Sequence, residues 1–336
     1  MTTENLNLSS LLESTPVDLE HCDFVAARLL LDCRCDLGEG IIYDDRKNCV
    51  LWTDINHKKF HKLDLTDVTK VVHTVYDLPK QLGSFGLLET DSESLPLLCA
   101  WEDSFQLYDM ELQKPLGRES VGEDVNPMKG GSRLNDGRVE PQGNRFLSGG
   151  HNGGDSNIKM KVFQCEQGSD GMLVHRPSIE NISTTNSLCW STDSSKLYFA
   201  DSPTRQIYSF DYNSTNGNLS NKTLVHTKSI DEHSVPDGSC VDSEGYIWNA
   251  VWRAGAGPGM VHRIDPQSGQ IVFTVHMPDG TSQVTCCCYG GKDMDVLFIT
   301  SAAEGRDAKK EPHAGGLYCI RLPFKGRREG RLKFTI

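Results

Sequence analysis

The chain has 336 residues, and its 34 basic and 46 acidic side chains give a formal net charge of -12. This acidic balance, with no basic stripe before residue 325, excludes nucleic acid and anionic membranes as expected partners. A hydrophobic share of 37%, with 31 glycines and 14 prolines, is typical of a globular protein rich in turns and poor in long helices.

The first 20 residues contain neither a basic start nor a continuous apolar run, so we expect no secretory signal. No run of about 18 uncharged apolar residues that could span a membrane occurs in the sequence. We therefore predict a cytoplasmic protein with a disordered segment over residues 1–20 and one domain over residues 21–336.

The 12 cysteines lie in apolar runs such as residues 285–289, which is typical of free, buried thiols in a reducing compartment. Cys33 and Cys35 are separated by one residue, which is too close for the usual zinc-binding pair. His57 and His61 lie in a strand and hairpin rather than on one helical face, so we expect both on the surface.

A repeat is visible from residue 37 onward. Each copy has a polar or glycine-rich start, an alternating segment, a turn, a strongly apolar strand, a second turn and a closing strand. In chain order, the copies contain the sequences LGEG, GSFG, LNDG, NSLC, PDGS and VTCC. The corresponding positions are Gly38, Ser84, Asn135, Asn186, Asp237 and Thr285. They recur roughly every 50 residues without a helical pattern inside any copy, which predicts an all-β fold, a six-bladed β-propeller.

Residues 24–35, FVAARLLLDCRC, precede the first copy and have the composition of a strand. We expect this strand to complete the last blade and close the ring, which removes exposed sheet edges.

Two turn signals in the third copy lie too close together for two hairpins: Asp136-Gly137, and the run from Glu140 to Gly143. The repeat resolves the conflict. Residues 135–137 are expected to begin the innermost strand at the channel mouth, and residues 140–143 to form the true turn.

The innermost strand of every propeller blade lies beside the central channel, so the repeat positions should meet around one axis. Glu39 and Asp237 would contribute carboxylates there, and Asn135 and Asn186 amide oxygens. Such a group fits one divalent cation: oxygen ligands favour Ca²⁺, Mg²⁺ or Mn²⁺, and Zn²⁺ and Fe²⁺ stay open. The alternative is a hydrogen-bonded polar ring that holds water. We expect the small residue beside each polar position to let the backbone approach whatever occupies the channel.

The blocks LGEG, RLNDGRVEPQG, NSLCWSTDSSKLYFADSPTRQIYSFDYN, PDGSCVDSEGYIW and VTCCCYGG resemble those of the SMP-30/gluconolactonase/luciferin-regenerating-enzyme (regucalcin) family, over roughly residues 30–335. The resemblance implies a six-bladed propeller with one catalytic divalent metal that hydrolyses sugar lactones. It implies metal binding by Glu39, Asn186 and Asp237, with Asp237 also the catalytic base. Arg133 and Asn135 would bind the substrate.

The sequence departs from the family pattern in three segments, and each is a candidate cover for the site. Residues 149–158 include His151-Asn152-Gly153-Gly154 where the family has an acidic substrate contact, for which Asp155 is a weak replacement. Residues 253–259 form a glycine-rich hairpin that only superficially resembles a phosphate-binding loop. Residues 302–316 are an insertion that we expect to be a mobile surface loop.

The leading hypothesis is therefore a lactonase acting on a small cyclic ester, as a monomer or weak homo-oligomer. A phosphotriesterase of the diisopropylfluorophosphatase kind is one alternative, since that group resembles this one in its Glu, Asn, Asn, Asp set around calcium. A non-catalytic calcium-binding regulatory protein is the other. The basic residues near the end of the chain, Lys325 to Arg331, are expected to form a solvated terminus.

Overall fold

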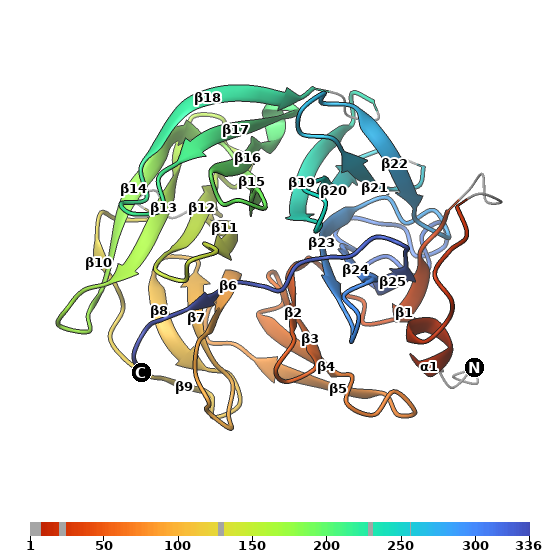
Figure 1. Cartoon of the computed structure of the whole chain (residues 1–336), viewed down its shortest axis with the longest axis horizontal. Coiled ribbons are helices and arrows are strands. Elements are labelled where there is room, and N and C mark those ends of the chain that lie inside the picture. The colour runs from red at the N-terminus through yellow and green to blue at the C-terminus, as the bar shows by residue number, and fades with distance from the viewer. Residues whose placement is uncertain (1–7, 20–24, 127–130, 228–230, 256) are drawn as a thin grey trace.

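The computed structural model describes residues 8–19, 25–126, 131–227, 231–255 and 257–336. Six sheets stand around a common axis, as Figure 1 shows, and each sheet forms one blade. The prediction of an all-β, six-bladed propeller is confirmed.

The first three blades follow the chain from the innermost strand outward. Blade 1 contains β2 (Gly38–Asp44), β3 (Cys49–Asp54), β4 (Lys59–Asp64) and β5 (Val72–Asp77). Blade 2 contains β6 (Leu82–Leu88), β7 (Pro96–Trp101), β8 (Phe105–Asp109) and β9 (Lys114–Pro115). Blade 3 contains β11 (Arg133–Val139), β12 (Phe146–His151), β13 (Met160–Gln167), β14 (Leu173–Ile182) and the added outer strand β10 (Val121–Gly122).

The other three blades have four strands each. Blade 4 contains β15 (Thr185–Trp190), β16 (Lys196–Asp201), β17 (Gln206–Tyr212) and β18 (Leu219–His226), with a 3-10 turn η1 (Ser202–Thr204) after β16. Blade 5 contains β19 (Ser234–Val241), β20 (Ile247–Arg253), β21 (Met260–Ile264) and β22 (Ile271–His276). Blade 6 contains β23 (Val284–Gly290), β24 (Val296–Ser301), β25 (Leu317–Arg321) and β1 (Arg28–Leu31).

Burial follows position in the blade. The second strands β3 and β7 are buried along their whole length, whereas the outer strand β18 is largely exposed. The apolar core fills the spaces between neighbouring blades. Trp248 of β20, for example, packs edge-on against Tyr289 of β23, with ring centroids 5.5 Å apart. Burial between blades explains why the second strand of each repeat is strongly apolar.

Both ends of the chain join the ring. The predicted closure is confirmed in a shorter form: β1 pairs antiparallel with β25, Arg28 opposite Cys319, as the outer strand of blade 6. Residues 8–12, within the segment expected to be disordered, instead form helix α1 (Leu8–Leu12) because Leu8 is buried against blade 6 and blade 1 residues. Residues 1–7 and 20–24 lie outside the described part of the chain.

The C-terminal tail, residues 325–336, is not the solvated terminus that we expected. Figure 1 shows it crossing the centre of the ring from blade 6 to β6, where β26 (Arg331–Leu332) pairs parallel with the end of β6. Leu332 and Phe334 are buried. The Arg331 guanidinium donates to Asp44 at 2.6 Å. The tail is ordered because these apolar and charged groups find partners on blades 1 to 3.

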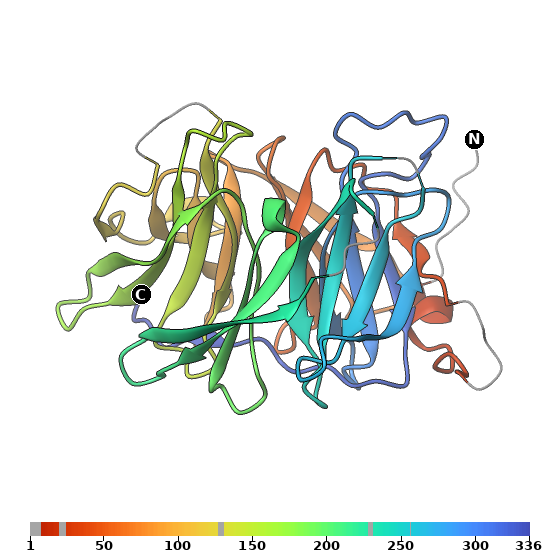
Figure 2. The ribbon, with the colours of Figure 1, turned by 90° about the horizontal axis from the view of Figure 1, so that it is seen from above.

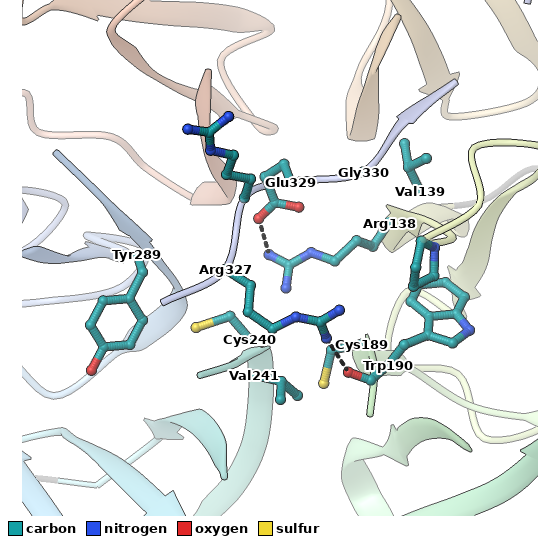
Figure 3. Close-up of a pocket in the computed structure, with 12 residues that line it drawn as sticks. Arg138, Val139, Cys189, Trp190, Cys240, Val241, Tyr289, Arg327, Glu329 and Gly330 are labelled. Carbon is teal, nitrogen blue, oxygen red and sulfur yellow. Dashed lines mark hydrogen bonds and ion pairs between the residues drawn. The ribbon is translucent and has the colours of Figure 1, made fainter. Parts of the chain in front are cut away.

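The tail lines a pocket of about 160 Å³ at this end of the channel (Figure 3). Arg138 of β11 faces Glu329 of the tail across it at 3.4 Å, and Arg327 donates to the Trp190 carbonyl oxygen. None of the predicted site residues lines this pocket. Those residues lie near the starts of the inner strands, whereas β26 pairs with the last residues of β6, so the tail closes the opposite end.

No helix in the described part of the chain has the length and apolar character needed to cross a membrane.

Candidate functional site

A register irregularity lies at or next to the repeat position of every inner strand. It falls, for example, between Glu39 and Ile42 in β2, between Asn186 and Cys189 in β15, and between Pro236 and Ser239 in β19. A bulge of this kind bends a strand and redirects one side chain, and bulges are common beside functional sites. The strand starts that carry the predicted ligands are therefore locally irregular in the same way.

The small residues beside the polar positions serve the contact between inner strands. A Cβ on Gly238 would lie 2.4 Å from the Cys286 sulfur, and one on Gly137 would lie 2.5 Å from Ser84 Oγ. Gly40 has a φ of 60°, which favours glycine. At these positions neighbouring strands approach too closely for a side chain. The expectation that the same residues also make room for a channel ligand stays a prediction.

Hydrogen bonds bring three of the predicted residues together. Arg133 donates to Asn135 Oδ1 at 2.5 Å, and Asn135 Nδ2 donates to Asn186 Oδ1 at 3.3 Å. The Asn186 amide then donates to Ser202 Oγ at 2.8 Å, whose hydroxyl donates to the Pro236 carbonyl oxygen. The network thus runs from blade 3 through blade 4 to the residue before Asp237.

Glu39 and Asp237 are the buried carboxylates of the site, each 6% exposed. Burial, and secondarily Asp136, raises the pKa of Glu39 to about 8. Burial, and then Glu39, raises the pKa of Asp237 well above its usual range. Asp237 Oδ1 is buried without a hydrogen-bond partner. Two buried acids that repel each other, one with an orphaned oxygen, are an arrangement that a cation would stabilise.

Arg133 supplies the positive charge next to these acids. Burial lowers its pKa to about 10, whereas Glu39, Glu304 and Asp237 favour its charged form. The guanidinium is therefore charged at neutral pH and within electrostatic reach of both predicted carboxylate ligands.

Two acidic residues near the site were missed in the sequence. Asp136 is buried and accepts from the Leu188 and Gly137 amides at 3.0 and 2.9 Å, so it holds inner strands together. Its position directly after Asn135 in LNDG was the available signal. Glu304, from the insertion after β24, is exposed and acts on Arg133. No sequence signal linked Glu304 to blade 3.

The segments that depart from the family pattern lie mainly in the loops that follow β12, β20 and β24. Asp155 is exposed and accepts from Asn157 in its own turn, so Glu304 is the better candidate for an acidic contact near Arg133. Residues 254–259 connect β20 to β21 and open no helix, as predicted; residue 256 lies outside the described part. Arg306 of the insertion donates to the Ala254 carbonyl oxygen at 3.2 Å, which joins two of these loops.

The histidine prediction holds for only one residue. The His57 side chain is 59% exposed, but His61 is 5% exposed because it packs beneath Trp52, with ring centroids 4.9 Å apart.

The fold and these residues define a class: a six-bladed propeller whose channel mouth holds a buried set of two acids, two amides and one arginine. The sequence profile described as the SMP-30/gluconolactonase/LRE-like region matches residues 37–303. The chain therefore belongs to the SMP-30/gluconolactonase/LRE-like family.

Named relatives agree with this assignment. Regucalcin of Xenopus laevis is 32% identical over 291 residues, covering 84% of this chain and 90% of the relative. The crystal structure of a calcium-binding protein, regucalcin, from Agrobacterium tumefaciens has a TM-score of 0.77 and 26% identity, with 93% and 98% of the two chains covered. A luciferin-regenerating enzyme, at 24% identity and a TM-score of 0.77 over 92% of this chain and 99% of its own, shows the fold alone.

Proposed function

We propose that this protein hydrolyses sugar lactones with the help of one divalent cation at the channel mouth. The observation that carries the proposal is the buried pair Glu39 and Asp237, with the Asp237 Oδ1 atom unpartnered, beside Asn186. Family membership supports it, since the family description includes gluconolactonases.

The residues present fit the cation. Glu39 and Asp237 offer carboxylate oxygens and Asn186 an amide oxygen, a set that hard ions such as Ca²⁺, Mg²⁺ or Mn²⁺ prefer and that Zn²⁺ and Fe²⁺ also accept. When bound, the ion would supply Lewis acidity, which polarises an ester carbonyl and makes water more acidic.

The remaining steps belong to the protein. Water adds to the lactone carbonyl carbon while Asp237 takes its proton, and the ring C–O bond then breaks as that proton passes to the leaving oxygen. Arg133 stabilises the negative charge that develops on the carbonyl oxygen. Asn135 holds the Arg133 guanidinium in place, and we assign exposed Glu304, which acts on Arg133, the role of accepting from sugar hydroxyls.

A small-molecule lactone is the proposed partner, and the free thiols of the described cysteines fit a cytoplasmic, reducing location. Nothing in this mechanism requires a second subunit, so we propose a monomer or weak homo-oligomer.

Metal-dependent turnover of an aldonolactone tests the proposal. Protein stripped with a chelator should be inactive, should recover with added divalent metal, and should stay inactive with every metal in the Asp237→Asn variant. Asp77→Asn, at a carboxylate that is 87% exposed, is the matched control and should keep full activity. Lactonase activity in Asp237→Asn equal to the control would contradict the mechanism.

The same preparation separates the alternatives. The amides of Asn135 and Asn186 are adjacent. Because the diisopropylfluorophosphatase kind also has two Asn residues in its set, phosphotriesters should be tested beside lactones. Preferential phosphotriester turnover would support a diisopropylfluorophosphatase-like enzyme, and calcium binding with no turnover of either would support a non-catalytic calcium-binding role.

A further inference from the structure

A second group of metal-binding atoms lies on blade 1, apart from the predicted oxygen ligands. We name Cys33, Cys35, Asp54 and His61 the thiol–imidazole cluster. Cys35 precedes β2, Asp54 ends β3 and His61 lies in β4. Ligand atoms of Cys35, Asp54 and His61 all lie within 4.8 Å of one another, and all three residues are buried.

The distances within the cluster fit a tetrahedral ion. The Cys33 and Cys35 sulfurs are 3.7 Å apart, and Cys35 Sγ is 3.7 Å from His61 Nε2. With metal–sulfur bonds of about 2.3 Å, two ligands on a tetrahedral zinc ion stand about 3.8 Å apart. These two separations match that spacing. Cys33 lies outside the group whose ligand atoms are all within 4.8 Å, so its thiol, which donates to the Gly315 carbonyl oxygen at 3.2 Å, would join the ion by a turn of the side chain.

The single residue between Cys33 and Cys35 does not keep their sulfurs apart in this fold. Arg34, between the two cysteines, has a φ of 51°. The chain turns at this residue, and both sulfurs come within reach of each other despite the single intervening position. The third and fourth ligands come from β3 and β4, so the site does not depend on the cysteine spacing alone.

Neighbouring groups hold the ligands as they would around a metal. The Asp54 carboxylate accepts from the Asp36 and Leu37 amides at 2.9 and 3.1 Å, and its Oδ2 also lies 2.9 Å from His57 Nδ1, so both oxygens are held in place by neighbours. His61 Nδ1 lies 3.0 Å from His73 Nε2. A proton on His61 Nδ1 shared with His73 leaves Nε2, the atom that faces Cys35, free to bind a metal.

Trp52 packs beside the cluster and offers it a buried N–H donor. Its ring stacks on both His61 and His73, and it is fully buried with its Nε1 donor unpartnered. A buried N–H beside a thiol can donate to a metal-bound thiolate, so metal binding would satisfy the orphaned donor.

We propose that the thiol–imidazole cluster binds one zinc ion, with Cys33, Cys35, Asp54 and His61 as its four ligands. Thiolate and imidazole ligands select zinc over the hard ions that suit an all-oxygen site. Four protein ligands leave no open position, so the ion is structural. It fixes the segment that leads into β2 and Glu39, and Cys35 also bonds Gly315 and Ala303 at the two ends of the insertion.

Cobalt substitution tests the site directly. Chelator-treated protein kept reduced and then given Co²⁺ should develop thiolate-to-cobalt charge-transfer absorption together with the visible bands of tetrahedral cobalt. Cys35→Ser and Cys33→Ser each remove one of two thiolates, and each should lower the charge-transfer band by at least about half. Cys49→Ser, at a buried thiol at the other end of β3, is the matched control and should keep the band. Glu39→Gln should also keep it, because the oxygen site has no sulfur.

Alkylation of the unmutated protein tests the same claim without relying on the folding of a variant. Zn²⁺ should slow alkylation of the partly exposed Cys33 at least about tenfold, as measured by peptide mass spectrometry. Absence of a charge-transfer band, an equal loss of the band in Cys49→Ser and Cys35→Ser, or unchanged alkylation of Cys33 would each overturn the proposal.

Discussion

At the scale of single residues, the ionisation of the buried acids Glu39 and Asp237 makes the stability of the metal-free protein depend on pH. Their raised pKa values mean that the metal-free protein holds protons there that the unfolded chain releases. A carboxyl group with a raised folded pKa stabilises the fold below its unfolded pKa, and this contribution is lost as the pH rises toward the folded value. For Glu39 the window runs from the ordinary value of 4.5 to about 8.

We therefore predict that the stability of the metal-free protein, relative to Glu39→Gln, falls as the pH rises from 4.5 to 8. The difference should change by up to about 1.4 kcal/mol per pH unit. Thermal unfolding of both proteins in chelator across this range measures it. A saturating divalent metal should remove the decline. If the two proteins without metal show parallel pH profiles, burial does not raise the pKa of Glu39.

Arg133 gives a prediction about rate. Its planar guanidinium is held by Asn135 beside both acids, and lysine cannot keep that geometry although it keeps the charge. Arg133→Lys should lower kcat for an aldonolactone by about 10²–10³ fold, the usual cost of losing one donor to a developing oxyanion. Steady-state kinetics measure this effect, with Arg118→Lys, at an exposed position, as the control. A kcat within twofold of the control would remove Arg133 from the mechanism.

At the scale of single elements, the strands were predictable and their irregularities were not. Alternating and apolar runs mark β3 and β16 clearly, and the repeat of polar and small residues placed Glu39 and Asp237 on inner strands. The register shift in β19 and the close approach of the neighbouring inner strand at Gly238 lie side by side in the structure. The residue pattern of one strand does not say how closely the next strand packs against it. The close packing at these glycines therefore became visible only in the structure.

The tail shows the same limit. Its basic residues indicated a solvated end because their partners, such as Asp44, lie nearly the whole chain away in sequence. Glu304 and the thiol–imidazole cluster were missed for the same reason. Glu304 acts on Arg133 of another blade, and the cluster combines residues from different strands.

The tail also yields a prediction. Deleting residues 330–336 removes the buried Leu332 and Phe334 and should destabilise the protein by about 3–6 kcal/mol, at about 1.5–3 kcal/mol per buried apolar side chain. Urea unfolding monitored by tryptophan fluorescence measures the loss. Deleting Ile336 alone, which is 58% exposed, should change stability little. Equal stability of the full-length protein and the longer deletion would mean that the tail does not hold the ring.

At the scale of the whole molecule, the ring converts a repeat in sequence into a site in space. Each blade contributes one strand start to the mouth, and the tail closes the opposite end, as the side view in Figure 2 helps to follow. β1 completes blade 6, which joins the segment before blade 1 to the last blade. The architecture followed from the period of the repeat alone, whereas the loops that surround the mouth had to be seen in three dimensions.

The central claim is that Glu39, Asn186 and Asp237 together hold one divalent ion. Crystals of the protein soaked in Mn²⁺, a hard ion that suits oxygen ligands, test it through anomalous diffraction. We predict one strong anomalous peak at the channel mouth, about 2 to 2.6 Å from oxygens of all three side chains. A map in which Mn²⁺ binds elsewhere, with these three side chains free of any peak while the protein hydrolyses lactones in Mn²⁺, would contradict the account.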